Sequence, residues 1–570
     1  MQWDLRQLFA DEKALGAFLK QCKDDSAAFR KKFESKICDL KAVEFKKALQ
    51  DYEKIAFGVA KIMTYTYLCF AKDTTQGAKY AKIELECKQI EENTLFFELE
   101  FCELPPKKAQ EFIGACFEHS FYLENLIKNK KHNLSKKEER VILHLSSTGG
   151  RAFARLFDET MSRLKIPFNG EFVGEEEILS KLYSSDRGTR KAAAKAFSKV
   201  LQKNAPLLCY IFNMIKAERK SICELRGFKN AEESRHISNQ ITQASVDLLI
   251  ETTEQNFHLV STFYKRKRQI LGLKSLKDYD RYAPIGKDIK MNYEKAQKIV
   301  LEAFGNFSPK FAQIAKSAFK NKWIDVYPGA NKQGGAFSHS ATSDTHPFVM
   351  LNFTGRRRDL FTLAHELGHA AHQTLSYGVN FLSQDTPLTT AETASVFAEM
   401  LVFDYMKKTL SKSELLGLYA AKLEDIFATL YRQINFTTFE RAIHAHDGEL
   451  SLEKMSELWL KESEKMFAGS VQLGAHYGLW WSYIPHFIHT PFYCYAYAYA
   501  QLLVLALYGL YKSGACKDFT ARYLQMLSLG GSKSPKELVA LFGFDIESKD
   551  FWALGIREIE KMLGEFLRLK

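Results

Sequence analysis

The chain contains little that would interrupt a helix and no recognisable disulfide framework. Only 12 of its 570 residues are proline, and helix formers such as Lys, Glu, Leu and Ala occur throughout, which predicts a mostly helical protein. The ten cysteines are scattered and include no CxxC pair, a pattern typical of reduced, buried thiols in a cytoplasmic protein. The ordinary composition excludes long disorder, collagen-like repeats and a small disulfide-bonded fold.

The sequence also has no stretch that clearly targets a membrane. The N-terminus, Met-Gln-Trp-Asp-Leu-Arg, is charged from the start and lacks the apolar region typical of a signal peptide. Residues 492–511 are long enough to span a bilayer, but Gln501 and several tyrosines in this stretch favour a buried helix instead. We therefore expect a soluble, cytoplasmic protein with no membrane partner.

The excess of positive charge is small for a chain of this length. A net charge of +12 arises from 80 Lys and Arg against 68 Asp and Glu. Basic clusters such as 265–268 and 356–358 lie among acidic residues, without the interleaved aromatics of a single-strand binding groove. We expect no nucleic-acid partner; a nucleic-acid binder would show steeply salt-dependent binding.

At 570 residues the chain exceeds what one hydrophobic core usually organises, so two lobes are expected. We divide it into an N-terminal helical region, residues 1–185, and a catalytic region, residues 186–570. Asp186 is a suitable cap for the alanine-rich helix that follows. Between 323 and 353, short apolar runs separated by Gly, Pro, Asn and Ser predict a few strands.

The strongest motif follows these strands directly. Residues 365–369 have the sequence H-E-L-G-H, which is the HExxH pattern. On a helix, His365 and His369 lie one above the other and can bind one zinc ion, while Glu366 lies beside the metal-bound water as a general base. His372 is not expected to be a third ligand, because seven residues separate it from His365 by about 10.5 Å along a helix axis.

A second polar cluster supplies candidates for the third ligand. Glu392 and Glu399 are seven residues apart in an otherwise apolar segment, so they share a helix face, and buried carboxylates there need positive partners. We assign Glu392 to the zinc ion and Glu399 to the second nitrogen of a liganding histidine; the pattern also allows other roles for the two carboxylates.

Histidine and tyrosine are dense between residues 484 and 497. Their hydroxyl and imidazole groups are suitable donors to the oxyanion that forms when water attacks a carbonyl. Tyrosines at helical spacing also commonly pack in a core, so composition alone leaves both interpretations open.

These segments together resemble the thimet-oligopeptidase-like zinc metallopeptidases, in particular oligoendopeptidase F. The resemblance rests on H-E-L-G-H-A-A-H, on E-T-A-S with a further Glu, and on the I-P-H-F and F-Y-C-Y-A-Y segments. It covers most of the chain from about residue 140 onward. The first hundred residues match only in being helical.

The resemblance implies a mainly α-helical fold with two lobes flanking a deep substrate channel and a small β-sheet beside the active-site helix. It implies one zinc ion per chain, held by His365, His369 and Glu392, with Glu366 as the base. His486, Tyr493 and Tyr495 are the best matches to the transition-state donors of the family, and His489 is a further candidate.

The function that follows is a zinc metalloendopeptidase that hydrolyses internal bonds of short, unfolded peptides. Two alternatives stay open at this point. An exopeptidase would use the same zinc site but need a free terminus in its substrate. A peptide carrier would bind without cutting, although it would have no need of the base Glu366.

Overall fold

A computed structural model describes residues 2–146 and 148–569 of the chain. The chain forms two compact units, each assembled from three separate stretches. Unit 1 comprises Met1–Lys130, Ile289–Thr409 and Gly514–Gly543, and unit 2 comprises Lys131–Asp288, Leu410–Ser513 and Phe544–Lys570. This division differs from the boundary expected at residue 185, because the N-terminal helices pack in the same unit as the HExxH helix.

Unit 1 is mostly helical, as the sequence predicts, and contains one small sheet. Its helices are α1 (Glu12–Phe33), α2 (Ala42–Lys72), α3 (Gly77–Thr94), α4 (Phe96–Glu103), α5 (Pro106–Ala115), α6 (Ser120–Asn129), α14 (Tyr293–Phe307), α15 (Pro309–Lys320), α16 (Arg357–Ser376), α17 (Leu388–Ala391), α18 (Thr393–Met406), α24 (Phe519–Ser528) and α25 (Pro535–Ala540). Its strands are β3 (Ile324–Asp325), β4 (Phe337–His339) and β5 (Phe348–Met350).

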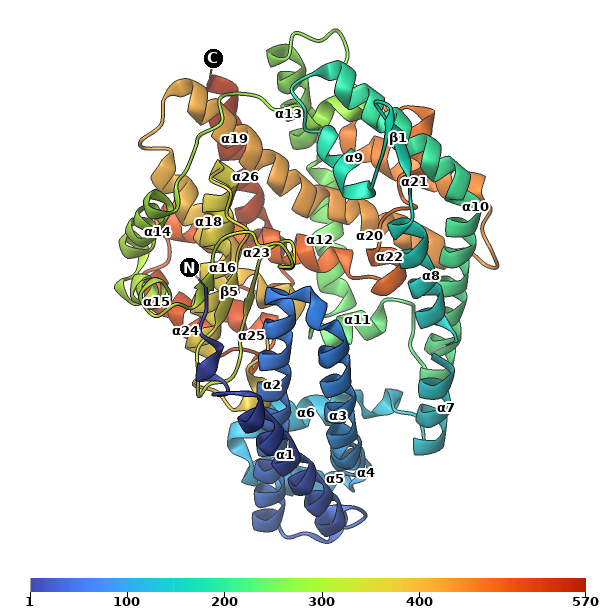
Figure 1. Cartoon of the computed structure of the whole chain (residues 1–570), viewed down its shortest axis with the longest axis vertical. Helices are drawn as coiled ribbons and strands as arrows, with labels where there is room; N and C mark the ends of the chain where they lie inside the picture. Colours follow the sequence, from blue (N-terminus) through green and yellow to red (C-terminus); the bar gives the residue numbers. More distant parts are fainter. Residues whose placement is uncertain (1, 147, 570) are drawn as a thin grey trace. The chain divides into compact units, whose positions relative to one another are not determined.

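Helices α1, α2 and α3 lie side by side (Figure 1). Apolar side chains at three- and four-residue spacing, such as Leu15, Leu19 and Cys22, are buried between them. The core formed in this way extends to Phe348 and Met350 of β5. The sheet is therefore supported on one side by the N-terminal helices of the same unit.

The sheet predicted between residues 323 and 353 is confirmed. Strand β5 is central, pairing in parallel with β3 and antiparallel with β4, so β4 is an edge strand. Helix α16, which carries the HExxH motif, lies beside β4 and β5 (Figure 1). The side chain of Gln373 joins helix to edge strand, because its Nε2 donates to the carbonyl oxygen of Ser338 at 3.0 Å and its Oε1 accepts from the Ser338 hydroxyl at 2.7 Å.

Unit 2 is helical apart from one hairpin. Its helices are α7 (Lys136–Ser146), α8 (Gly150–Ser162), α9 (Glu175–Lys181), α10 (Arg187–Arg226), α11 (Glu233–Ser238), α12 (Gln243–Gln255), α13 (Phe257–Ile270), α19 (Lys412–Ile426), α20 (Arg432–Ala445), α21 (Leu452–Phe467), α22 (His486–His489), α23 (Cys494–Ser513) and α26 (Lys549–Arg568). The hairpin is β1 (Ile166–Phe168) and β2 (Glu171–Val173).

Two helices of unit 2 bear out specific sequence expectations. Asp186 caps α10, since its side chain accepts a hydrogen bond from the backbone N–H of Thr189 at 2.6 Å. Helix α23 is long and apolar enough to cross a membrane by length and composition, and 83% of its most apolar window is buried inside the protein. Packing against α26 and α20 accounts for that apolar character.

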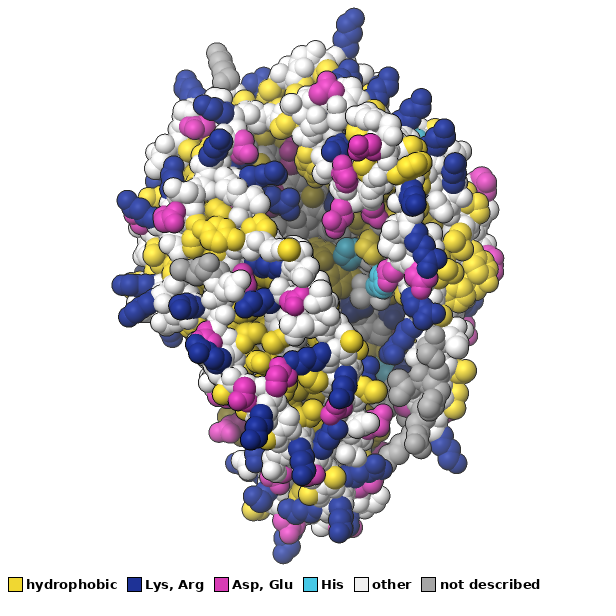
Figure 2. All heavy atoms as spheres, viewed as in Figure 1, with side chains coloured by type: hydrophobic (Ala, Val, Ile, Leu, Met, Phe, Trp, Pro, Cys, Tyr) yellow, Lys and Arg dark blue, Asp and Glu magenta, His cyan; other side chains and the backbone are white. Residues whose placement is uncertain are grey.

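The surface and the cysteines also agree with the composition. On the face seen in Figure 2, Lys and Arg side chains are interspersed with Asp and Glu. All ten cysteines, which lie within the described residues, are thiols outside any disulfide.

Candidate active site

The two histidines of the HExxH motif project from one face of α16. Their spacing of four residues is close to one helical turn, so both imidazoles reach the same point in space. The other side of the helix is buried through Leu363, Ala364 and Leu367. This burial fixes the direction in which the two imidazoles point.

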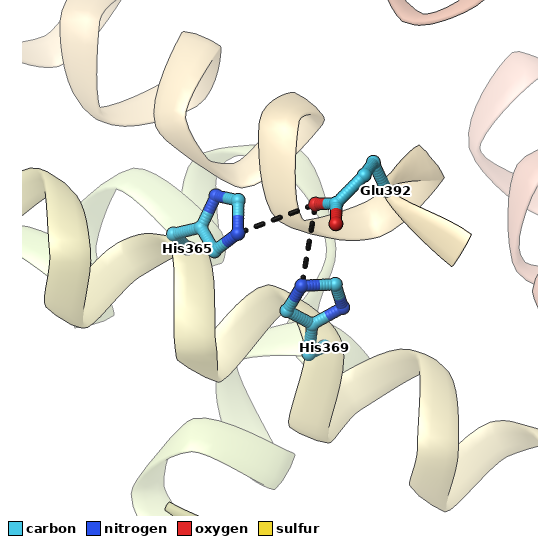
Figure 3. Close-up of side chains that lie close together, drawn as sticks. All are labelled: His365, His369 and Glu392. Carbon is cyan, nitrogen blue, oxygen red and sulfur yellow. Dashed lines mark ion pairs between the residues drawn. The ribbon is translucent and has the colours of Figure 1, made fainter. Parts of the chain in front are cut away.

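Glu392 completes a group that could hold a metal ion. It lies at the junction between α17 and α18, and among the described residues the group consists of His365, His369 and Glu392 (Figure 3). Nε2 of His365 and Nε2 of His369 lie 3.2 and 3.3 Å from the same Glu392 oxygen, Oε2. Two ligands on a tetrahedral ion with bonds of about 2.0–2.1 Å are about 3.3 Å apart. The three atoms are therefore spaced as ligands of one ion would be.

Hydrogen bonds from neighbouring residues orient this group. Nδ1 of His365 donates to Oε1 of Glu399 at 2.7 Å, and the Ser395 hydroxyl donates to Oε2 of Glu392 at 2.6 Å. Both partners lie on α18, which packs along α16. Such outer contacts fix the tautomer and the orientation of a metal-binding imidazole.

The electrostatics of the group favour a cation. Burial would lower the pKa of His365, but its hydrogen bonds to the carboxylates of Glu392 and Glu399 outweigh this effect and raise that pKa well above its usual value. Burial would raise the pKa of Glu392, whereas the imidazoles of His365 and His369 hold it well below its usual value. Without a metal ion, a proton on an imidazole therefore offsets the negative charge of the carboxylates. A bound divalent ion would offset the same charge and leave the imidazoles neutral.

Glu366 lies next to this group and is only 6% exposed. Burial raises its pKa, although His365 and His369 act in the opposite direction. A carboxylate in this environment is more basic than an exposed glutamate.

His372 lies outside the metal-binding group of the described residues. It is buried, and desolvation lowers its pKa to about 4. It is therefore neutral near pH 7 and faces the same cavity as the HExxH residues.

A cavity of about 430 Å³ extends from the metal-binding group. Its walls are α16, the edge strand β4 and the loop that precedes α17. The size is within the range of small-ligand sites, and every residue that lines it belongs to unit 1.

The predicted transition-state donors belong to unit 2. The rings of His486 and Tyr493 have centroids 5.7 Å apart, and Nε2 of His486 lies 3.3 Å from the Tyr497 hydroxyl. His489 instead lies 2.8 Å from a carboxylate oxygen of Asp158. His486 and Tyr493 thus form one cluster, which includes Tyr497.

Tyr495 has a different environment from Tyr493. Its side chain is fully buried, and its hydroxyl lies 2.9 Å from both Nδ1 of His236 and Nδ2 of Asn239. Residues two apart on a helix point in nearly opposite directions, whereas residues four apart share a face. Helical spacing could have indicated Tyr497 as the companion of Tyr493, and the surroundings of Tyr495 give it a structural contact with α11.

Comparisons with known proteins identify the family to which the chain belongs. Residues 180–558 match the family described as Peptidase family M3, and residues 100–166 match the one described as Oligopeptidase F. An "Oligoendopeptidase F homolog" of Lactococcus lactis is 27% identical over 100% of this chain and 97% of its own length.

Solved structures show the same fold. A crystal structure from Chlamydophila abortus superposes with a TM-score of 0.89 at 23% identity, covering 100% of this chain and 98% of the other. The crystal structure of oligoendopeptidase-F from Enterococcus faecium superposes with a TM-score of 0.73 at 20% identity, covering 97% of each chain.

The helical fold, the HExxH helix and these matches define a peptidase. More particularly, the chain belongs to peptidase family M3, and the resemblance to oligoendopeptidase F seen in the sequence is confirmed.

Proposed function

We propose that this protein is a zinc-dependent endopeptidase that cleaves internal bonds of short, unfolded peptides in the cytoplasm. The observation that supports the metal is the approach of two Nε2 atoms, one from His365 and one from His369, to a single oxygen of Glu392 at 3.2 and 3.3 Å. Imidazole and carboxylate are the ligand types that zinc takes in catalytic sites with one open position.

The chemistry divides between the ion and the chain. When bound, zinc lowers the pKa of a water molecule and polarises the scissile carbonyl. Glu366 accepts the proton of the attacking water and passes it to the leaving amine. Its buried position, which raises its pKa, keeps the carboxylate basic enough for that transfer. Glu399 keeps the His365 ring in the tautomer that leaves Nε2 available to the ion.

The remaining roles in this proposal rest on the family resemblance. The edge strand β4 is a candidate to pair with an extended peptide, since in the part of the chain that the structure describes it has a neighbouring strand on one side only. His486 and Tyr493 are the proposed hydrogen-bond donors to the oxyanion. Tyr497, whose hydroxyl lies 3.3 Å from Nε2 of His486, is a further candidate for this role. We do not assign Tyr495 to the oxyanion, because its hydroxyl is engaged by His236 and Asn239.

The test is hydrolysis of an internally quenched peptide that is blocked at both ends. We expect cleavage that a chelator abolishes and added zinc restores, with one zinc ion per chain by elemental analysis. Glu366→Gln should keep the zinc and lose roughly 10²–10⁴-fold in cleavage rate. The control is Glu92→Gln, at an exposed position on α3, which should cleave at the wild-type rate. A fully active Glu366→Gln enzyme would contradict the mechanism. Cleavage restricted to peptides with a free terminus would indicate an exopeptidase, and zinc and peptide binding without cleavage a carrier.

A further inference from the structure

The loop that precedes α17 brings a second acidic group to the cavity beside the metal-binding residues. Asp385 lines the cavity, and its side chain remains accessible. Nevertheless, desolvation raises the pKa of its carboxyl. The carboxylate is therefore within reach of a ligand in the cavity, where a cation would offset its charge.

No cationic side chain of the described residues that line the cavity compensates Asp385. The lining contains neither Lys nor Arg, and no hydrogen bond or ion pair of the described residues engages this carboxylate. His372, the nearby lining imidazole outside the metal group, has its pKa lowered to about 4 by burial and is neutral. A divalent ion would balance Glu366 and Glu392 but would leave the charge of Asp385 unmatched.

The backbone holds Asp385 firmly in place. The N–H of Gly531 donates to the carbonyl oxygen of Ser383 at 2.8 Å. A Cβ on Gly531 would lie only 2.0 Å from the carbonyl oxygen of Asp385, so only glycine permits this close approach. The backbone of the loop is thus fixed against the Gly530–Gly531 turn, which keeps Asp385 at the edge of the cavity.

From this geometry we propose that Asp385 determines substrate specificity, by receiving a cationic Lys or Arg side chain of the peptide in the cavity beside the metal site. The neutral polar side chains of Gln384 and Thr386 line the same cavity and offer oxygen atoms that can accept hydrogen bonds from an ammonium or guanidinium group. This inference rests on the proposed endopeptidase function. The α-amino group of a substrate carries the same charge, and the test separates the two sources.

The experiment uses quenched peptides blocked at both ends, in which one Lys is moved through successive positions and compared with norleucine, its uncharged analogue. At one position we expect the wild-type enzyme to prefer Lys by about tenfold in kcat/KM, as befits a charge-assisted contact. Asp385→Asn should reduce that preference to within about twofold, and kcat/KM for the norleucine peptides should stay at its wild-type value. Asp344→Asn is the matched control, because that carboxylate is already paired with Lys61. A preference that is absent at every position, or that survives in Asp385→Asn, would overturn the proposal.

Binding to Glu366→Gln protein separates the two hypotheses. If no peptide is cleaved, the proposed function fails, and the affinities of the Lys and norleucine peptides still decide the role of Asp385. Equal affinities for the Lys and norleucine peptides would overturn the role proposed for Asp385. An effect of Asp385→Asn that depends on a free N-terminus and not on Lys would assign the carboxylate to the α-amino group and overturn the side-chain assignment.

Discussion

Nδ1 of His365 donates a hydrogen bond to Oε1 of Glu399 at 2.7 Å, and the opposite ring nitrogen faces Glu392 at 3.2 Å. One imidazole is therefore held between two carboxylates from the same helical region. The outer carboxylate fixes the tautomer and increases the basicity of the nitrogen that faces the metal position.

Substituting the outer carboxylate should weaken metal binding without abolishing it. We expect Glu399→Gln to reduce the affinity for zinc by about 10–100-fold, since the neutral amide no longer raises the basicity of His365. Competition against a chromogenic chelator measures this directly. Glu92→Gln is the control, and an unchanged affinity in Glu399→Gln would contradict the role given to this contact.

The packing of α16 on α18 depends on a glycine inside the motif. A Cβ added to Gly368 would lie 2.6 Å from both the Ala394 carbonyl oxygen and the Ser395 Cα, and these backbone atoms cannot move away easily. Gly368→Ala should therefore separate the two helices, lower the unfolding free energy by about 1–3 kcal/mol and weaken zinc binding.

Thermal unfolding with and without zinc tests the effect of Gly368→Ala. Gly378→Ala is a matched control, because a Cβ at Gly378 would meet nothing within 4 Å. A Gly368→Ala protein that is as stable as the Gly378→Ala protein, with unchanged zinc affinity, would show that the helices can separate at no cost.

A buried acid in unit 2 predicts a dependence of stability on pH. Glu440 on α20 is fully buried, and its Oε1 accepts from the backbone N–H of Phe492 at 2.9 Å. Desolvation raises its pKa to about 8, against the opposing contribution of the Phe492 hydrogen bond. Because the folded pKa exceeds the ordinary value of 4.5, the folded protein keeps this proton up to about pH 8, whereas the unfolded chain releases it above about pH 4.5. Stability is therefore greatest at low pH and declines as the pH rises towards 8.

The unfolding free energy should therefore fall by up to about 1.4 kcal/mol per pH unit between about pH 5 and pH 8 through this group. Glu440→Gln keeps an acceptor for Phe492 and cannot ionise, so this part of the dependence should disappear and the variant should be the more stable protein at pH 8.5. Urea unfolding across that range, with the exposed Glu464→Gln as control, measures it. Parallel pH profiles for the wild type and Glu440→Gln would disprove the shift.

Local features of the protein could be predicted from residue order, because they depend on neighbours a few positions apart. Few prolines and regular apolar spacing predicted the helices, and Asp186 marked the start of α10. The HExxH spacing predicted that His365 and His369 share a face. Clusters of Gly, Pro and Asn among apolar runs predicted the sheet of β3, β4 and β5.

The surroundings of the tyrosines between residues 493 and 497 depend on the side of the helix that each one faces. Tyr493 and Tyr495 are both matched to the transition-state donors by the family resemblance, but side chains two residues apart on a helix point to opposite sides. The hydroxyl of Tyr495 consequently meets His236 and Asn239, and Tyr497 joins His486.

Tertiary structure alone decided the contacts between distant segments. The sequence predicts Glu392 at the metal ion and Glu399 at a liganding histidine without saying which histidine. The packing of α18 on α16 brings Glu399 to Nδ1 and Glu392 to Nε2 of the same imidazole, that of His365. Likewise, nothing near Asp385 in the sequence marks it, since its position depends on glycines almost 150 residues later. Periodicity along a chain encodes which face of an element is buried, but which other element covers that face depends on long-range packing.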